Sequence, residues 1–332
     1  MTVAPDLLPL EAIRVVGLAG AGSVGTAWAA LLLAHGYEVL FYDPDAQAGT
    51  RLKDGVREAW PALRAIYSGL DPLPPLERVG VAATLEDLAR GSDLVQENAG
   101  ESLETKRSVL STIDAALPAN KLILSSSGGV PPSRLQEFCA RPERLLLGHP
   151  FHPAYLVPLV EVVGGERTRE DAVDLAMRFY TALGKHPIRL KKEMVGHLTN
   201  RLQFAVLREA IHCLSEGVAS ADDIDASMRW GLGLRWAMVG PLMTFNLAGG
   251  PGGIEQLIDR FRSDVEQWWG ALGAPMLTDQ VCEKLFAGVR ELRHGISNDE
   301  WARWRDSALV ELLRFRSALP YPADAIQPRQ EN

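Results

Sequence analysis

Residues 13–43 read IRVVGLAGAGSVGTAWAALLLAHGYEVLFYD, and the order of elements in this stretch decides the fold. The apolar run 13–19 is rich in branched residues and predicts a buried strand. A glycine-rich turn, 20–25, leads into a predicted helix over 26–35, and 37–42 predicts the next strand. A strand, a helix and a second strand joined in this way predict a βαβ unit with parallel strands.

The turn in this stretch has the spacing of a dinucleotide-binding fingerprint. Gly20, Gly22 and Gly25 form G-x-G-x-x-G between strand and helix. The first glycine permits the tight turn, the second lets the backbone approach a pyrophosphate, and the third lets the helix pack on the strand. The helix N-terminus offers N–H groups and a positive dipole end to the phosphates.

An acidic residue completes the fingerprint. Asp43 follows the second strand, 18 residues after Gly25, where its carboxylate can accept hydrogen bonds from an adenosine ribose. Its charge would repel a 2′-phosphate, and no arginine follows it directly. The segment therefore predicts NAD as the cofactor, in preference to NADP.

Strand-like and helix-like stretches continue to alternate as far as residue 190. Further strands are expected at 79–82, 94–96, 121–124, 145–147, 157–163 and 188–190, with helices at 51–64, 102–117 and 169–183. This alternation predicts a doubly wound, mainly parallel sheet, the α/β Rossmann type. Ligands of such sheets bind beyond the carboxyl ends of the strands. Since 98–101, 125–129 and His149 each follow a predicted strand, we expect them to meet in one crevice.

The pattern becomes helical near residue 194. Helices are expected at 197–217, 221–229, 254–268, 277–289 and 299–317, with the glycine-rich cluster 249–253 as a break. We therefore expect an NAD-binding Rossmann-type domain over 1–193 and an all-α C-terminal domain over 194–332. The broad apolar faces of the second domain predict a homodimer interface, and we expect this domain also to bind the substrate. The polar, proline-bearing tail from Pro320 is expected to fray.

Composition and charge exclude several classes of protein. The 47% hydrophobic and 23% charged fractions of the 332 residues are those of a globular chain that needs no disulfide or structural metal. A net charge of −8 argues against nucleic acids and anionic membranes as partners. Cys139, Cys213 and Cys282 lie far apart and predict reduced thiols and no metal centre. Without a signal-like N-terminus or a long apolar run, the chain is expected to be cytoplasmic with no membrane span.

Residues 148–163, GHPFHPAYLVPLVEVV, carry the strongest chemical signal. His149 ends one apolar run, and Glu161 lies inside another. A glutamate in so apolar a strand is rarely buried without a partner. A histidine held by that carboxylate would have a fixed tautomer and raised basicity, as a general base near neutral pH needs. The alternative, a structural histidine and an edge-strand glutamate, stays open on this segment alone.

With these motifs assembled, the chain resembles the 3-hydroxyacyl-CoA dehydrogenase superfamily over nearly its whole length. Within it, the chain looks most like the branch that contains lambda-crystallin/L-gulonate 3-dehydrogenase and L-carnitine dehydrogenase. The glycine fingerprint alone would not select this family, and the specific stretches are 96–106, 148–161, 192–203 and 231–241. The resemblance implies that His149 is the catalytic base, Glu161 its partner, and Asn200 the asparagine near the reacting hydroxyl.

The resemblance also implies which residues contact the cofactor. Positions that match NAD contacts in the family are Ser23, Val24, Asp43, Glu101 and Lys106. For Glu101 and Lys106 the alternative is an ordinary surface pair five residues apart.

Two residues depart from the family pattern within the inferred site. Gly128 stands where the family has a serine, with Ser127 at the preceding threonine position, and His152 stands where the family has an asparagine. A missing hydroxyl donor beside a developing charge could cost about 1.5–3 kcal/mol if nothing replaces it. Ser127, Ser126 or His152 could stand in for it. Alternatively, the site has been reshaped for another substrate, or weakened.

The resemblance implies an NAD-dependent oxidoreductase that interconverts a small 3-hydroxy carboxylate, gulonate-like or carnitine-like, and its 3-keto form. Arg235 is the candidate fork for the substrate carboxylate, with an interdomain or subunit salt bridge as the alternative. A quaternary ammonium group would need aromatic faces. Trp and Phe residues of the second half could provide them or belong to its core and interfaces; they are Trp230, Trp236, Phe245, Trp268 and Trp269.

Three other classes stay open. One is a 3-hydroxyacyl-CoA dehydrogenase, which would need a basic patch for the CoA phosphates. Arg51, Lys53, Arg57 and Arg64 could form it, although Asp54 and Glu58 interrupt the patch. Another is a non-catalytic, lambda-crystallin-like NAD-binding structural protein. The last is a beta-hydroxyacid dehydrogenase with a lysine base, which the match at His149 disfavours.

Overall fold

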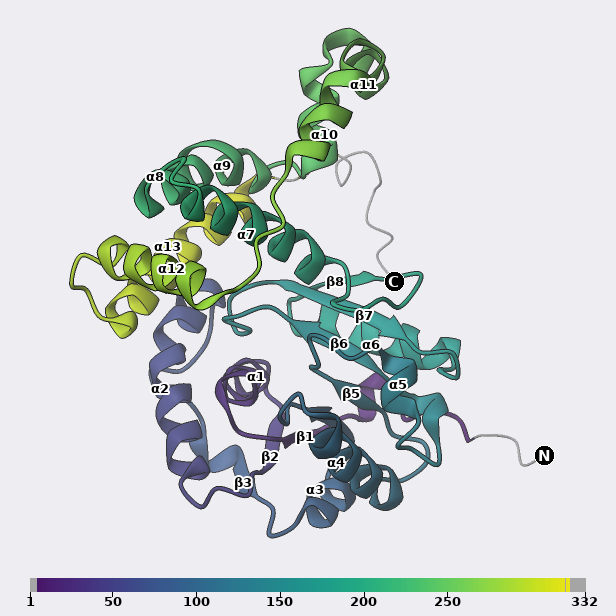
Figure 1. Ribbon diagram of the computed structural model, residues 1–332. Helices are drawn as coiled ribbons and strands as arrows, with labels where there is room; N and C mark the ends of the chain where they lie inside the picture. Colours follow the sequence, from purple (N-terminus) through teal and green to yellow (C-terminus); the bar gives the residue numbers. More distant parts are fainter. Residues whose placement is uncertain (1–4, 320, 323–332) are drawn as a thin grey trace. The chain divides into compact units, whose positions relative to one another are not determined.

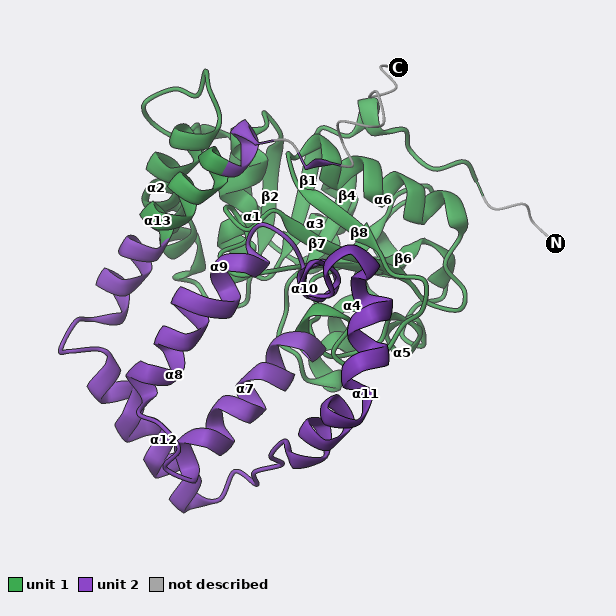
Figure 2. Ribbon diagram, turned by 90° about the horizontal axis from the view of Figure 1, so that it is seen from above, with its two compact units in different colours: residues 1–200, 306–315 green, residues 201–305, 316–332 purple. Residues whose placement is uncertain are grey.

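The computed structural model describes residues 5–319 and 321–322. The described chain folds into two compact units, residues 5–200 with 306–315 and residues 201–305 with 316–319 and 321–322 (Figure 2). Of the tail expected to fray, only residues 321 and 322 are described, so that expectation lies outside the described residues.

The first unit is built on an eight-stranded sheet with the order β3-β2-β1-β4-β5-β6-β7-β8 (Figure 1). Neighbouring strands are parallel, except that β6 and β7 are antiparallel. The strands are β1 Val15–Ala19, β2 Glu38–Tyr42, β3 Val79–Val81, β4 Leu94–Glu97, β5 Ile123–Ser125, β6 Leu145–Pro150, β7 Leu159–Gly164 and β8 His186–Arg189. The order reverses between β1 and β4, which is where ligands bind in sheets of this kind. The predicted doubly wound α/β fold is confirmed.

Alternating side chains of the central strands bury two separate apolar cores. On one face, Leu124 and Leu146 pack with α1 Ser23–Ala34, α2 Ala48–Ile66 and α6 Glu170–Ala182. On the other, Ile123 and Leu147 pack with the helices α3 Leu85–Gly91, α4 Leu103–Ala116 and α5 Pro132–Gln136. Both faces of each central strand are therefore covered, which explains their continuous apolar sequences.

Two helices of this unit were not expected from the sequence. Helix α3 spans only seven residues and begins where the Thr84 hydroxyl accepts a hydrogen bond from Asp87 N–H. Helix α5 spans only five residues and follows Pro131, with Pro132 at its first position. Each is too short to show a helical period in the sequence.

The second unit is all-helical, as predicted. Its helices are α7 Thr199–Ser215, which begins within the first unit, α8 Ala221–Ser227, α9 Gly233–Trp236, α10 Pro241–Ala248, α11 Gly253–Ala271, α12 Asp279–Leu292 and α13 Asn298–Ala318, part of which belongs to the first unit. A π-helical turn, Met228–Leu232, joins α8 to α9. Over residues 5–319 and 321–322, no helix combines the length and the apolar content needed to cross a membrane.

Candidate active site

The glycine turn between β1 and α1 is shaped by close backbone contacts. Gly20 has φ +101°, and a Cβ there would lie 2.8 Å from the carbonyl oxygen of Asn98. A Cβ on Gly25 would lie 2.1 Å from the carbonyl oxygen of Gly20. At Gly22, in contrast, a Cβ would meet nothing of the described chain within 4 Å. The turn is thus closed on the protein side and open at Gly22, the residue directly before the helix.

The open side of the turn has the groups that a dinucleotide needs. The first backbone bond of α1 runs from Thr26 N–H to Gly22 C=O at 2.8 Å, so the preceding N–H groups of Ser23, Val24 and Gly25 have no partner within the helix. Asp43 accepts hydrogen bonds from the N–H groups of Ala21 and Asp45, each at 2.9 Å. These contacts fix the carboxylate beside the turn. Its remaining lone pairs can accept ribose hydroxyls, so these residues fit NAD.

A cavity of about 310 Å³ adjoins this turn. Its lining includes Gly22, Ser23, Arg51, Glu58 and His152. His152 is exposed and comes from the loop between β6 and β7. The residue that departs from the family asparagine therefore lies near the cofactor turn.

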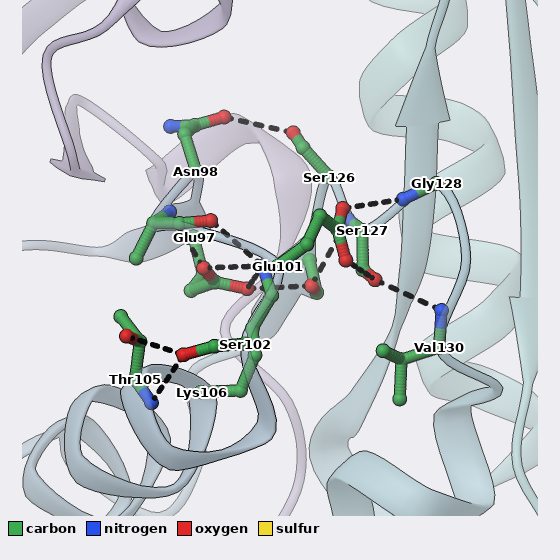
Figure 3. A network of polar contacts seen from close by, with 12 residues as sticks. Glu97, Asn98, Glu101, Ser102, Thr105, Lys106, Ser126, Ser127, Gly128 and Val130 are labelled. Atoms are coloured by element: carbon green, nitrogen blue, oxygen red, sulfur yellow. Dashed lines mark hydrogen bonds and ion pairs between the residues drawn. The ribbon is translucent and has the colours of Figure 1, made fainter. Parts of the chain in front are cut away.

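Lys106 is buried and pairs with Glu97, a residue that the sequence motifs do not identify as part of the site (Figure 3). Its Nζ lies 2.8 Å and 3.0 Å from the two carboxylate oxygens of Glu97 and 3.0 Å from the carbonyl oxygen of Ala99. Glu97 also accepts hydrogen bonds from Ser125 Oγ–H at 2.6 Å and Ala99 N–H at 2.7 Å. The pair joins α4 to the ends of β4 and β5. The alternative interpretation, in which Lys106 forms a surface pair with Glu101, is therefore wrong. Contact of Lys106 with NAD stays a prediction.

Glu101 instead holds the turn that follows β5 (Figure 3). Its carboxylate accepts a hydrogen bond from the Ser127 hydroxyl at 2.7 Å and one from Gly128 N–H at 2.8 Å. The residues after β4 and after β5 therefore meet, as expected from the carboxyl ends of neighbouring parallel strands. Contact of Glu101 with NAD also stays a prediction.

His149 and Glu161 face each other across the β6–β7 pair, in direct register. Nδ1 of His149 lies 3.0 Å from Oε2 of Glu161, and both side chains are buried. The other carboxylate oxygen accepts the N–H groups of Leu198 at 3.1 Å and Thr199 at 2.7 Å, at the start of α7. Burial alone would raise the pKa of Glu161. The hydrogen bonds from His149 and Thr199 outweigh burial, so its pKa lies below the ordinary value.

The other ring nitrogen of His149 faces Gly128. A Cβ on Gly128 would lie 3.1 Å from His149 Nε2 and 3.3 Å from Asn200 Nδ2. Asn200 Nδ2–H donates to the Gly128 carbonyl oxygen at 2.9 Å. The three predicted catalytic residues are thus brought together, and the imidazole nitrogen and the amide converge on the space beside Gly128. Their catalytic roles stay predictions.

A buried network of hydrogen bonds around Gln96 supports this arrangement. The sequence motifs do not predict it. Gln96 Nε2–H donates to Ser126 Oγ at 2.8 Å and to the Gly148 carbonyl oxygen at 3.3 Å. The Tyr180 hydroxyl donates to Gln96 Oε1 at 2.7 Å. Burial raises the pKa of Tyr180, so it remains a neutral donor. The network ties α6 and β4 to the backbone directly before His149.

The hydroxyl groups of Ser126 and Ser127, which could replace the family serine, already donate hydrogen bonds within the protein. The Ser126 hydroxyl donates to Asn98 Oδ1 at 2.8 Å, and the Ser127 hydroxyl donates to Glu101 (Figure 3). Either serine would have to give up this bond in order to donate to a substrate. Arg235 is exposed on α9 of the second unit, and its contact with substrate stays a prediction. No group of three His, Cys, Asp or Glu side chains within the described ranges is placed to hold a metal ion.

Comparison with known proteins identifies the family of this chain. The NAD-binding domain of 3-hydroxyacyl-CoA dehydrogenase matches residues 15–194, and the C-terminal domain of that family matches residues 196–291. The chain is 43% identical over 314 residues to L-carnitine dehydrogenase of Streptomyces griseus, covering 95% of this chain and 93% of the relative. It is 39% identical over 301 residues to L-carnitine dehydrogenase of Pseudomonas putida, covering 91% and 93%.

A solved structure is similar over most of the chain. The crystal structure of 5-formyl-3-hydroxy-2-methylpyridine 4-carboxylic acid 5-dehydrogenase, an NAD⁺-dependent dismutase, has a TM-score of 0.78 and 27% identity, covering 91% of this chain and 98% of that chain. Both domains of the family are present, and they follow each other in the family's order. The first contains the sheet and the glycine turn described above. The chain therefore belongs to the 3-hydroxyacyl-CoA dehydrogenase family and is one of its NAD-dependent dehydrogenases.

Proposed function

We propose that this dehydrogenase interconverts a small 3-hydroxy carboxylate, gulonate-like or carnitine-like, and its 3-keto acid. The observation that carries the proposal is the position of His149, between the Glu161 carboxylate and the space beside Gly128. The similarity to L-carnitine dehydrogenases over more than nine-tenths of the chain supports the substrate class.

His149 acts as the general base in this proposal. The Glu161 carboxylate only accepts hydrogen bonds when ionised, so His149 Nδ1 carries the hydrogen and Nε2 is the basic nitrogen. Nε2 removes the hydroxyl proton of the substrate. The nearby carboxylate then stabilises the imidazolium that forms. Bound NAD would accept the hydride that leaves the carbon bearing this hydroxyl. Base catalysis of this kind is worth about 10²- to 10⁴-fold in rate.

Asn200 positions the reacting oxygen. Its amide is anchored by the Gly128 carbonyl and lies next to the same space as Nε2. An amide N–H that fixes the oxygen near the base keeps the reacting atoms in one geometry, which is a large part of enzymatic rate enhancement.

The charges on α2 favour a small substrate over an acyl-CoA. Arg57 lies 2.5 Å from Asp54, and Arg51 lies 2.7 Å from Asp45. Two of the four basic residues considered for CoA phosphates are therefore paired with carboxylates. Arg235 remains the proposed fork for the substrate carboxylate, and Ser127 and His152 the proposed neighbours of the substrate.

The helical C-terminal region is proposed to bind the substrate and to form the interface of a homodimer. We propose an NAD-binding domain over 1–193 and a substrate and dimerisation domain over 194–332. Helix α11 has no buried residue in the single chain, and Trp268 and Trp269 on it are 62% and 66% exposed. Apolar surface of this kind marks protein interfaces. Sedimentation at twice the 36.2 kDa chain mass would support the homodimer, and a monomer would refute it. A cytoplasmic location also stays a proposal.

The function is tested by following NAD reduction with L-carnitine, L-gulonate, 3-hydroxybutyrate and a 3-hydroxyacyl-CoA. The proposal predicts that a free 3-hydroxy acid has a higher kcat/KM than the thioester. Turnover of the thioester alone would assign the chain to the CoA-dependent branch. No turnover of any alcohol, with NAD still bound, would support the non-catalytic alternative.

A further inference from the structure

His197 is a buried histidine with a backbone conformation that few residues adopt. It is fully buried and has φ +49°, directly after Gly196 with φ +74°. The left-handed region is disfavoured for residues with a Cβ, although histidine, asparagine and aspartate are enriched there among such residues. The two left-handed residues turn the chain into α7 immediately before the backbone N–H groups that bind Glu161.

The side chain of His197 binds the turn that holds Gly128. Nε2 lies 2.9 Å from the carbonyl oxygen of Ser127. A carbonyl oxygen only accepts hydrogen bonds, so Nε2 carries the hydrogen. Nδ1 is buried and has no hydrogen-bond partner among the described residues. In the neutral ring Nδ1 carries no hydrogen. A protonated ring would bury an N–H group there without an acceptor, which is costly.

The Ser127–Gly128 segment is consequently held from two sides. Glu101 accepts hydrogen bonds from it, while His197 and Asn200 donate to its two carbonyl oxygens. This segment borders the space in front of His149 Nε2. A shift of the segment would change where a substrate lies relative to the base, and misplacement by about 1 Å can cost about 10²-fold in rate.

We propose, on the basis of the proposed function, that His197 is a positioning residue whose neutral imidazole fixes Ser127–Gly128 beside the His149 base. Protonation of His197 then impairs the site. In this role the residue acts through the segment that it holds.

The groups around the ring explain why it stays neutral. His149 on β6 is a titratable neighbour, with ring centroids 5.3 Å apart, and Glu161 on β7 and Glu101 before α4 also act on it. Burial, the largest effect, lowers the pKa of His197, and His149 lowers it further. The Ser127 carbonyl and the two glutamates raise it by less, so the pKa lies below the ordinary histidine value. His197 is therefore neutral near pH 7 and gains its proton only as the pH falls through that lowered pKa.

The kinetic test compares His197→Asn with His197→Phe, using the substrate that the wild-type enzyme turns over best. Asparagine tolerates the left-handed backbone and retains an N–H donor, but it does not titrate. Phenylalanine keeps a ring and removes the donor. We expect His197→Phe to lower kcat by about tenfold, the loss that corresponds to one hydrogen bond. His197→Asn should lower kcat less.

The pH profile separates positioning from a merely structural role. In the wild-type enzyme, log kcat/KM should fall more steeply at acid pH than in His197→Asn, because only the wild-type enzyme has a group at position 197 that gains a proton. His294→Asn is the matched control, because His294 is exposed and has the same φ of +49°. It should keep the wild-type profile. A wild-type slope in His197→Asn, with wild-type kcat in both variants, would overturn the proposal.

A readout without turnover keeps this proposal distinct from the proposed function. Side-chain ¹⁵N spectra of the histidine-labelled protein, assigned with His197→Asn, should show the Nε2–H tautomer and a pKa below that of an ordinary histidine. An Nδ1–H tautomer or an ordinary pKa would overturn the role of His197 even in an active enzyme. Absence of turnover in the wild type, with the expected spectra, would instead count against the proposed function alone.

Discussion

Nδ1 of His149 lies 3.0 Å from Oε2 of Glu161, across the antiparallel pair of β6 and β7 in which the two residues are direct partners. Because side chains alternate between the two faces of a strand, a slip of one residue in this register would move one partner to the other face. The His149–Glu161 contact therefore depends on the register of β6 and β7, and the catalytic proposal depends on that contact.

Glu161→Gln should lower kcat by about 10²-fold, a part of the 10²- to 10⁴-fold that base catalysis supplies, because a neutral amide stabilises the imidazolium less than a carboxylate. The affinity for NAD should change little, since Glu161 lies on β7, four strands along the sheet from β1, which leads into the glycine turn. Steady-state kinetics and NAD titration measure both. Equal losses in NAD affinity and kcat would point to a disturbed fold instead.

Gly128→Ala and Gly128→Ser should both lower kcat/KM, by about tenfold or more. A Cβ at this position would lie 3.1 Å from His149 Nε2, so that the imidazole must shift or the substrate loses room. Steady-state kinetics of the two variants distinguish the steric effect of the added Cβ from the effect of the added hydroxyl group. If Gly128→Ser were more active than the wild-type enzyme while Gly128→Ala was impaired, a missing hydroxyl would explain the departure from the family, and the steric account would be wrong.

The sequence predicted most of this site because its signals are local. The glycine turn, Asp43 and the two residues of the His149–Glu161 pair each follow or lie within an apolar run that identifies a strand. Glu97 lies in a similar buried run, Leu94–Glu97, and the same argument that singled out Glu161 could have found it.

The remaining features could not be predicted because they depend on which strands are neighbours. The bonds from Gln96 to Ser126 and Gly148 join residues 30 and 52 positions apart, and they form only because β4, β5 and β6 are adjacent. The left-handed backbone of His197 has no signature in a single sequence, apart from the glycine before it.

Lys106→Met should destabilise the protein by about 3–5 kcal/mol, because it leaves the buried carboxylate of Glu97 without its counter-charge. The side chains of Lys106 and Glu97 are 1% and 0% exposed. Denaturant unfolding measures the loss. The double variant Glu97→Gln/Lys106→Met should recover part of it.

Lys121→Met is the matched control for this pair. Lys121 lies 3.0 Å from Asp93, but both side chains retain partial access to water. Its loss should therefore be smaller. An equal loss in Lys121→Met and Lys106→Met would show that burial of the Glu97–Lys106 pair has no special weight. Titration with NAD in the double variant also tests the predicted cofactor contact of Lys106.

Lys185 should make the stability depend on pH above neutrality. Burial lowers the pKa of Lys185 to about 7, and its Nζ donates to the carbonyl oxygens of Ala154 and Val157. In the unfolded chain the pKa of the Lys185 side chain is near 10.4. Between about pH 7 and this value, the unfolded state therefore binds more protons than the folded state. The free energy of unfolding should therefore rise with pH there, by up to about 1.4 kcal/mol per unit.

Urea unfolding between these pH values tests this expectation. Lys185→Met should remove the slope, while Lys191→Met, a change at an exposed lysine, should retain it. The same slope in Lys185→Met as in the wild-type protein would show that Lys185 is not the group responsible.

The most direct test of the central claim is the turnover of His149→Gln, with NAD affinity measured in parallel. Glutamine keeps a polar side chain but cannot remove a proton. The account predicts that kcat with the best 3-hydroxy acid falls by about 10²- to 10⁴-fold while NAD still binds. Turnover close to that of the wild-type enzyme would contradict the assignment of His149 as the base.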